Sequence, residues 1–300
     1  MKIVFCNDNL STRTVDSCYE SEAIAASEVG LSFELIDFSA VRQREMHSST
    51  RLVTESSELE TAIYRGWMLN PDEYKLMYDA LYRRNIRLIN SPEQYSHCHW
   101  LHNSYPIIEG YTPQTVWMPL ENKSLDMQDI SKLLKQFSSA PVIVKDYVKS
   151  RKHEWNEACF IPDTSDVEKV TKVVNRFIEL QGELEGGLVF REFVNFEPIG
   201  IHPKSGMPLT LEYRLFVLED TVIVESPYWD GQSDLDRPPV NLFQDVLGNI
   251  QSNFFTCDIA RTTEGHWLIV ELGDGQVAGL PEQCELKAFY DAIAKRMRKH

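Results

Sequence analysis

Two acidic residues lie among apolar ones in the segment FFTCDIARTTEGHWLIVELGDGQVAGLP, residues 254–281. Two apolar runs flank a polar turn, so this segment predicts a β-hairpin. With the turn at Thr262–Gly265, Asp258 pairs with Ile269, and Glu271 is its diagonal neighbour on the same face. A slip of one pair would set the two acids directly opposite each other.

Like charges beside each other destabilise a strand pair unless a cation lies between them. Mg²⁺ suits oxygen ligands at this spacing, because it typically binds one or two carboxylates together with substrate phosphates. The turn that follows, VELGDGQ, adds two glycines and another acid, Asp274. It favours a binding site at Asp258 and Glu271 over the alternative, a solvated outer face of the sheet.

The densest basic run short of the C-terminal tail follows another apolar strand. In PVIVKDYVKSRKHEW, Lys145 comes directly after four apolar residues. It is followed by the basic residues Lys149, Arg151 and Lys152 and by His153. A lysine on a strand can contact phosphate oxygens as a point charge, and a basic loop after it can cover them. The alternative is an exposed, solvated loop.

Two further strand-like segments add candidates. In LEYRLF, Glu212 and Arg214 are two residues apart, so they lie on one face of a strand. An arginine beside acids on a sheet suits a triphosphate held by Mg²⁺, and the alternative is a structural ion pair. In GGLVFREFV, Glu192 stands in an apolar segment of the kind that can hold adenine through backbone groups. By itself that signal is weak.

The cluster HCHWLH holds His97, Cys98, His99 and His102 within six residues. If the segment is helical, Cys98 and His102 share a face, which zinc could use. No second Cys/His group supplies further ligands, so a structural role is favoured. The sequence contains no GxSxG, HExxH, Walker A or kinase motif set.

Alternating strands and helices in the first third of the chain predict an open α/β domain. No glycine follows the first strand, so the Rossmann fingerprint is absent and a dinucleotide site is not expected there. We expect strands near 2–6, 31–38, 60–69 and 86–90, and helices near 14–29 and after Pro71.

From about residue 114 the pattern predicts an α+β domain with a mainly antiparallel sheet. Helices are expected near 126–138, 164–181, 239–250 and in the basic-ended tail 282–300. Strands are expected near 140–148, 187–196, 209–220, 221–229, 254–260 and 267–274. We therefore divide the chain into an N-terminal α/β domain, 1–113, and a second domain, 114–300.

The composition of the 300 residues is that of a globular protein, with 43% hydrophobic and 25% charged residues. The formal net charge of -15 argues against nucleic acid as a partner, so a polyanionic ligand needs a local basic pocket. No apolar run is long enough to span a membrane, and no membrane partner is expected. Six scattered cysteines predict free thiols in a reducing compartment, hence a cytoplasmic location.

The order of these motifs along the chain resembles that of the ATP-grasp superfamily. The local sequence resembles that of its RimK-related bacterial and phage subgroup. The resemblance covers residues 60–281, and its last phrase is the most specific. The matching phrases are YRGWML, LINSPEQY, VKDYVKSRKHEW, REFV, EYRLFV and DIA…WLIVELGDGQVAGLP. The fold it implies is an N-terminal open α/β domain followed by an ATP-grasp fold with a mainly antiparallel sheet.

The resemblance implies ATP and Mg²⁺ as cofactors and a role for each matching residue. Lys145 corresponds to the lysine on the α-phosphate, Lys152 to the lysine of the covering loop, and Arg214 to the arginine that reaches the phosphates or an acyl-phosphate. The further cofactor-binding candidates are Glu212 and the adenine-holding segment Arg191, Glu192, Phe193 and Val194.

The resemblance also implies that Asp258 and Glu271 bind Mg²⁺. The family often has an asparagine two residues after its second acid. Here that position is Gly273, and Asp274 is the candidate to replace it as a third metal ligand.

The implied activity is ATP-dependent ligation of a carboxylate and an amine through an acyl-phosphate, with Lys145 and Arg214 as catalytic residues. The alternative is an ATP-binding assembly or regulatory factor that uses the same pocket without ligation. A purely structural protein does not explain charges inside apolar strands, since buried charges need partners. The two substrates, each a small molecule or a peptide or protein, are not identified, and Arg65, Trp67 and residues 105–112 could line their pocket.

Overall fold

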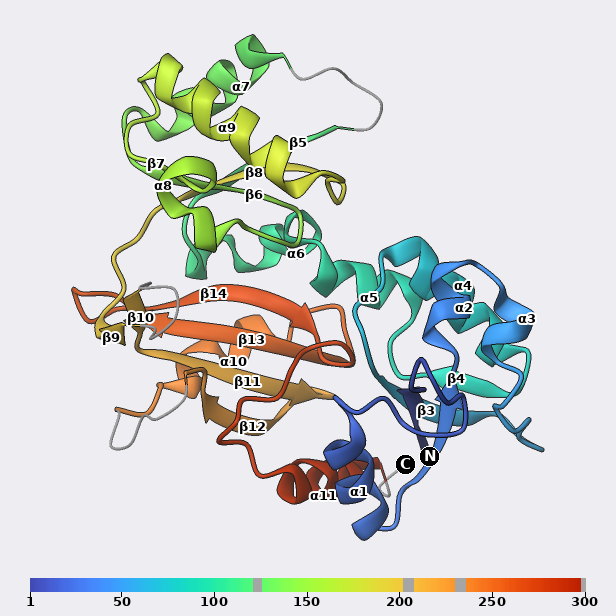
Figure 1. Ribbon diagram of the computed structural model, residues 1–300. Helices are drawn as coiled ribbons and strands as arrows, with labels where there is room; N and C mark the ends of the chain where they lie inside the picture. The colour runs from blue at the N-terminus through green and yellow to red at the C-terminus, as the bar shows by residue number, and fades with distance from the viewer. Residues whose placement is uncertain (121–125, 202–207, 230–235, 298–300) are drawn as a thin grey trace.

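The computed structural model describes residues 1–120, 126–201, 208–229 and 236–297. Its described strands form three four-stranded sheets and one two-stranded sheet. The N-terminal sheet lies beside the central sheet that carries β11 to β14, and a smaller lobe lies above the central sheet (Figure 1). Across the described ranges, no helix is both long and apolar enough to cross a membrane.

The N-terminal sheet is parallel, with the order β2-β1-β3-β4, which confirms the expected α/β pattern. Its strands are β1 (Lys2–Cys6), β2 (Ser32–Ile36), β3 (Glu60–Arg65) and β4 (Ile86–Leu88). Its helices are α1 (Glu20–Glu28), α2 (Phe38–Arg42), α3 (Met46–Ser49) and α4 (Pro71–Tyr82). The helix α1 is shorter than the expected 14–29, because the preceding residues form turns closed by a bridge between Asn7 and Val15.

Two short helices that the sequence analysis did not place follow this sheet, α5 (Pro92–His99) and α6 (Leu101–Ile108). The side chain of Ser91 and that of Gln94 form a capping box at the start of α5. The chain is extended at Trp100, so the two helices are separate. They run beneath the small lobe and pack against β14 (Figure 1).

The small lobe has an antiparallel sheet in the order β5-β8-β6-β7. Its strands are β5 (Thr115–Pro119), β6 (Val142–Asp146), β7 (Phe160–Ile161) and β8 (Gly187–Glu192). Its helices are α7 (Met127–Leu134), α8 (Trp155–Ala158) and α9 (Val167–Gln181). Apolar residues at helical spacing on α9, among them Val170, Val174 and Phe177, pack into the core of this lobe.

The central sheet is antiparallel, with the order β12-β11-β13-β14. Its strands are β11 (Glu212–Leu218), β12 (Thr221–Pro227), β13 (Phe254–Arg261) and β14 (Trp267–Asp274), and β9 (Pro198–Ile201) pairs with β10 (Pro208–Thr210) beside it. Alternate residues such as Leu215, Cys257 and Ile259 fill the core, so the residues between them face the other way. The helix α10 (Gln244–Leu247) packs on the core side.

The C-terminal helix α11 (Leu286–Met297) packs against α1, and its last three residues lie outside the described part of the chain. The change from parallel to antiparallel sheets falls between β4 and β5, on either side of residue 113. The division of the chain into two domains at that residue stays a prediction.

Candidate functional site

The two acids of the predicted hairpin lie directly opposite each other. Asp258 of β13 pairs with Glu271 of β14, while Ile259 pairs with Ile269, so Val270 is an extra residue in a β-bulge. The expected pairing of Asp258 with Ile269 is therefore wrong, and the slipped register is the one observed. The bulge shifts Glu271 by one position and brings both carboxylates to one place on the sheet.

Arg214 lies on β11, the other neighbouring strand of β13, and pairs with Asp258 there. Its Nε and Nη2 donate to Oδ1 and Oδ2 of Asp258 at 2.8 and 2.7 Å, a bidentate ion pair. The guanidinium also lies 4.7 Å from the ring centre of Tyr228. Burial lowers the pKa of Arg214, but the charge and hydrogen bonds of Asp258 together with the charges of Tyr228 and Glu271 outweigh this effect, and the pKa is raised.

Lys145 of β6 reaches Glu271 from the small lobe. Its Nζ lies 2.6 Å from Oε1 of Glu271, so this ion pair joins the small lobe to the central sheet. Desolvation raises the pKa of Glu271, but Lys145 and the more distant Lys152 and Arg191 outweigh it, and the pKa is lowered. Glu271 is therefore ionised at neutral pH.

Lys152 and Glu212 extend this arrangement of alternating charges. Burial lowers the pKa of Lys152, but the charges of Glu212 and Glu271 raise it above its usual value. Glu212 is buried, and burial together with Asp258 raises its pKa to about 7, against the opposing charge of Lys152. Six predicted residues thus lie together: Lys145, Lys152, Glu212, Arg214, Asp258 and Glu271.

The predicted adenine segment lies at the end of β8, where its side chains contact other parts of the protein. The guanidinium of Arg191 donates to Thr112 Oγ1 and to the carbonyl of Ile269, and burial lowers its pKa to about 10. Glu192 Oε2 accepts from the backbone N–H of Gln114 at 3.4 Å.

The ring of Phe193 packs edge-on against Trp155 and Phe160, and its N–H donates to the carbonyl of Pro141. The binding of adenine along residues 191–194 stays a prediction.

Asp274, the candidate third ligand, is buried and accepts several hydrogen bonds, and its role as a metal ligand stays a prediction. Asn90 Nδ2 donates to its Oδ2 at 2.6 Å, and the backbone N–H and Nε2 of Gln276 donate to its Oδ1. Burial raises its pKa to about 7 despite these hydrogen bonds. Its carboxylate ties β14 to the loop after β4, which is a structural role that the sequence did not indicate.

The side chains present suit an Mg²⁺ ion that shares its ligands with substrate phosphates, and they do not suit a metal bound by the protein alone. No group of three or more His, Cys, Asp or Glu side chains in the described part of the chain could hold a metal ion. Mg²⁺ is commonly bound by only one or two carboxylates plus substrate phosphates, and Asp258 with Glu271 supplies such a pair. Each acid is balanced by a cation that could instead contact phosphate.

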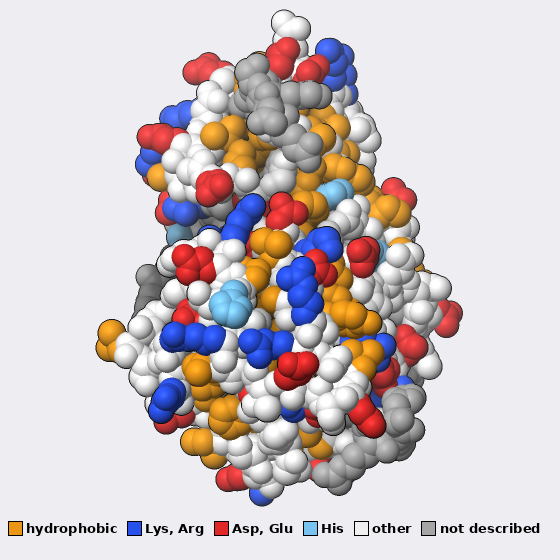
Figure 2. Space-filling model, turned by 90° about the vertical axis from the view of Figure 1, so that its right-hand side faces the viewer, with side chains coloured by type: hydrophobic (Ala, Val, Ile, Leu, Met, Phe, Trp, Pro, Cys, Tyr) orange, Lys and Arg blue, Asp and Glu red, His pale blue; other side chains and the backbone are white. Residues whose placement is uncertain are grey.

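A cavity of about 170 Å³ adjoins the acidic pair. It continues from these residues toward the N-terminal sheet, α5 and the end of β6. Its lining consists of Met68, His99, Val148, Arg214, Thr256, Asp258, Glu271, Leu272, Gly273, Asp274, Val277, Ala278 and Gly279. Lys and Arg side chains lie beside hydrophobic ones where the small lobe meets the rest of the molecule (Figure 2).

Arg65 and Trp67, which were expected to line the substrate pocket, are not among the residues that line this cavity. Arg65 is fully buried, where its guanidinium donates to Glu22 and to the carbonyl of Gly275. Trp67 is 40% exposed, and its Nε1 donates to Asp16.

The HCHWLH cluster forms no metal site among the described residues. Cys98 and His102 belong to different helices, and Cys98 lies in the hydrophobic core, where burial raises the pKa of its thiol. Only His99 of this cluster lines the cavity. Sequence reasoning weighed it as a zinc ligand and missed this placement, although the capping box at Ser91 could have placed the helix that carries it.

Comparisons with known proteins identify what the chain resembles. The model of the family described as "ATP-grasp domain, R2K clade family 3" matches residues 134–293, slightly more than half of the chain. No curated protein matches its sequence.

Solved structures match over the whole length. The D-cycloserine synthetase DcsG has a TM-score of 0.59 and 14% identity, covering 99% of this chain and 100% of its own. A RimK-domain ATP-grasp protein from Sphaerobacter thermophilus DSM 20745 has a TM-score of 0.58 and 11% identity, covering 98% of each chain. The macrocyclase MdnC from Microcystis aeruginosa MRC, bound to its precursor peptide MdnA, has a TM-score of 0.56 and 11% identity, covering 100% of each. At these identities the likeness shows the fold.

Proposed function

Since this chain belongs to the ATP-grasp domain family, R2K clade family 3, we propose that it is an ATP-dependent carboxylate–amine ligase. The observation that carries the proposal is the ion pair of Lys145 with Glu271 next to that of Arg214 with Asp258. It places cations from two lobes and two carboxylates from one hairpin at a single position. Cations for phosphate and carboxylates for a metal are what phosphoryl transfer from ATP requires.

We propose that ATP lies between the small lobe and the central sheet. The phosphates would contact Lys145, Lys152 and Arg214, and the adenine would lie along residues 191–194. The protein is acidic as a whole, so a polyanionic ligand such as ATP needs a local group of cations, and these three side chains supply one. Glu212 lies next to Lys152 and Arg214, where it can hold both cations in position for the nucleotide.

Asp258 and Glu271 would hold Mg²⁺, with Asp274 left in its buried hydrogen bonds. When bound, Mg²⁺ neutralises the developing charge on the phosphates. With Mg²⁺ held by the two carboxylates, Lys145 and Arg214 would be available to contact the phosphates.

Ligation needs no nucleophile from the protein. The carboxylate of one substrate attacks the γ-phosphorus of ATP, which gives an acyl-phosphate and ADP, and the amine of the other substrate then displaces phosphate. The protein contributes positioning and electrostatic stabilisation. Arg214, at the floor of the cavity, can neutralise the acyl-phosphate.

The cavity favours ligation over the alternative of an ATP-binding factor without turnover. It extends past the acids to Met68 and Val148, which lie outside the central sheet. Its volume of about 170 Å³ is below that typical of a whole ligand pocket. It fits the reacting ends of two substrates, whether these belong to small molecules or to peptides.

A cytoplasmic location follows as a further proposal from the cysteines. All six are free thiols in the structure, as is usual for proteins of a reducing compartment.

Release of ADP with a trapped acyl-phosphate tests the ligase function. The protein is incubated with Mg·ATP, hydroxylamine and each common amino acid or dipeptide as carboxylate donor. We expect donor-dependent ADP release and an equal amount of hydroxamate. Tight binding of Mg·ATP without ADP release from any donor would support the ATP-binding factor instead.

A further inference from the structure

The cavity is lined by the imidazole of His99, which has no role in the reaction as described so far. His99 is the last residue of α5, its side chain is 2% exposed, and it lines the same cavity as Arg214, Asp258 and Glu271. Its ring stacks on Tyr95 at 5.0 Å between ring centres. A buried imidazole that lines an active-site cavity can exchange a proton with a substrate bound there.

The ring of His99 is held at one nitrogen by a carboxylate from the small lobe. Nε2 of His99 lies 3.0 Å from Oε1 of Glu185, in the loop before β8. An ionised carboxylate only accepts hydrogen bonds, so Nε2 carries the proton of this bond. In the neutral ring, Nδ1 is then unprotonated and able to accept a proton.

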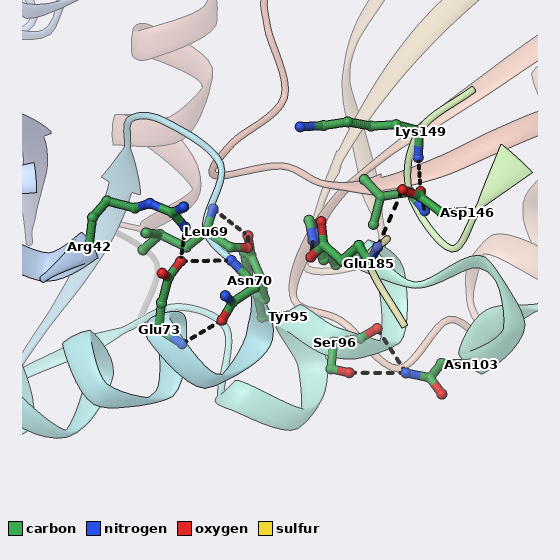
Figure 3. A network of polar contacts seen from close by, with 12 residues as sticks. Arg42, Leu69, Asn70, Glu73, Tyr95, Ser96, Asn103, Asp146, Lys149 and Glu185 are labelled. Carbon is green, nitrogen blue, oxygen red and sulfur yellow. Dashed lines mark hydrogen bonds and ion pairs between the residues drawn. The ribbon is translucent and has the colours of Figure 1, made fainter. Parts of the chain in front are cut away.

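The surroundings keep both members of this pair in place (Figure 3). The hydroxyl of Tyr95 donates to the carbonyl of Leu69 and accepts from its N–H, which fixes the ring beneath His99. Asp146, at the end of β6, accepts from the N–H groups of Glu185, Val148 and Lys149. The loops of the small lobe are therefore anchored to the strand that carries Lys145.

The ligation proposed above requires a group that removes a proton from the amine. We propose that His99 is this catalytic base, oriented by Glu185, and that the part of the cavity beside Met68 and Val148 receives the acceptor amine. This inference rests on the proposed ligase function. It assigns the acceptor to the side of the cavity away from the phosphates, where no lysine or arginine is among the lining residues described.

The step balances as a general-base displacement. The acceptor nitrogen attacks the acyl carbon and forms the C–N bond. The bond between that carbon and the phosphate oxygen breaks, and phosphate leaves with the electron pair. The proton of the attacking nitrogen passes to Nδ1 of His99. An orienting carboxylate behind the base is the arrangement found in catalytic triads.

In the described structure, titratable groups lie near His99 on the small lobe, on its own helix and on the central sheet, where Arg214 and Asp258 line the same cavity. Glu185 contacts it from the small lobe, and Tyr95 stacks on it from its own helix. Asp274 and Glu271 lie on β14, against which α5 packs, and line the same cavity. Burial raises the pKa of Tyr95 well above its usual value, so its hydroxyl stays neutral.

Histidine NMR tests the state of the ring without any substrate. Spectra of the ¹⁵N-histidine-labelled protein are compared with those of His99→Gln, whose missing signals identify His99. For the neutral ring we expect the proton on Nε2 and none on Nδ1. A neutral ring that carries its proton on Nδ1 would overturn the proposal.

Partition between two acceptors tests the catalytic role. Hydroxylamine is already unprotonated near neutral pH, whereas ammonium must lose a proton before it attacks. With a donor accepted by the parent, His99→Gln should retain hydroxamate formation and lose about a hundredfold or more of amide formation from ammonium. Glu185→Gln should reduce amide formation less and leave hydroxamate formation unchanged.

The matched control is His97→Gln, a buried histidine of the same helix that does not line the cavity. It should leave both rates unchanged. Equal loss of both rates in His99→Gln, or no loss of amide formation, would overturn the role of His99. Absence of hydroxamate from the parent itself would instead count against the proposed ligase function. If His99→Gln does not fold, the partition in Glu185→Gln decides, and an equal loss of both rates relative to the parent, or no loss of amide formation, would contradict the proposal.

Discussion

At the scale of single residues, the site is a set of ion pairs, and the proposed function gives each charge a second partner, phosphate or Mg²⁺. Arg214 and Lys145 neutralise Asp258 and Glu271 in the protein as described. The acids therefore do not repel each other without a metal, because a cation stands beside each of them. Removing one acid leaves a cation without its partner, so Asp258→Asn should destabilise the metal-free protein by about 1–3 kcal/mol.

Lys145 should be required for nucleotide binding. Lys145→Met keeps the length of the side chain and removes the ammonium group, which we expect to weaken Mg·ATP binding by about 1.5–3 kcal/mol, the range for a charge-assisted hydrogen bond. Titration calorimetry measures the change. Lys132→Met, on the exposed face of α7, is the control. An unchanged dissociation constant in Lys145→Met would show that the phosphates lie elsewhere.

At the scale of elements, the β-bulge in β14 and the start of α5 decide where the site residues point. The bulge at Val270 brings Glu271 opposite Asp258 and leaves Asp274 beside α5 and the loop after β4. There Asn90 also donates to the carbonyl of Phe254, so one buried amide joins the N-terminal sheet to two strands of the central sheet. The site is thus positioned by polar contacts between elements as well as by packing.

The buried carboxyl of Asp274 should make the stability of the protein depend on pH. Burial raises its pKa in the folded protein to about 7 from the usual 3.8, so the folded state retains a proton that the unfolded state releases. This contribution is complete below the unfolded pKa and is lost as the pH rises through the folded pKa. The free energy of unfolding should therefore fall between about pH 4 and 7, by up to about 1.4 kcal/mol per unit of pKa difference.

Urea unfolding at several pH values measures this dependence. In Asp274→Asn the decline over this range should be smaller than in the parent, whereas the exposed Asp72→Asn should keep the decline of the parent. An identical pH dependence in Asp274→Asn would mean that this carboxyl is ionised in the folded protein.

At the scale of the whole molecule, a buried ion pair joins the two ends of the chain to the cavity wall. Arg65 of β3 donates to both carboxylate oxygens of Glu22 on α1, and the hydroxyl of Tyr290 on α11 donates to the same carboxylate. The other end of the guanidinium holds the carbonyls of Gly275 and Ala278, in the loop that lines the cavity.

Glu22→Gln should therefore destabilise the protein strongly. It leaves the buried guanidinium of Arg65 without its counter-charge, which typically costs about 3–5 kcal/mol. Urea unfolding of this variant is compared with that of Glu20→Gln, an exposed residue of the same helix. A loss no larger than that of the control would contradict the structural role of the pair.

The sequence predicted most strands of the sheets, although not β5 or β9, and the acidic and basic candidates that lie together, because alternation and isolated charges in apolar strands are local signals. It did not predict the bulge at Val270, whose extra residue depends on how two strands pair. Nor did it predict that Asp274 is buried against Asn90, or that His99 faces the cavity, since these depend on contacts between distant segments. The strand β7, with two residues, is too short to show a pattern.

The stabilisation by Mg·ATP tests the central claim most directly. Ligand binding raises the free energy of unfolding by about 2.7 kcal/mol at a hundredfold excess over Kd. Thermal unfolding of the parent, Asp258→Asn and Glu271→Gln is measured with and without Mg·ATP, each variant against its own ligand-free state. The account predicts a clear rise in Tm for the parent and little or none for either variant. An equal rise in all three proteins would contradict the assignment of these acids to the metal.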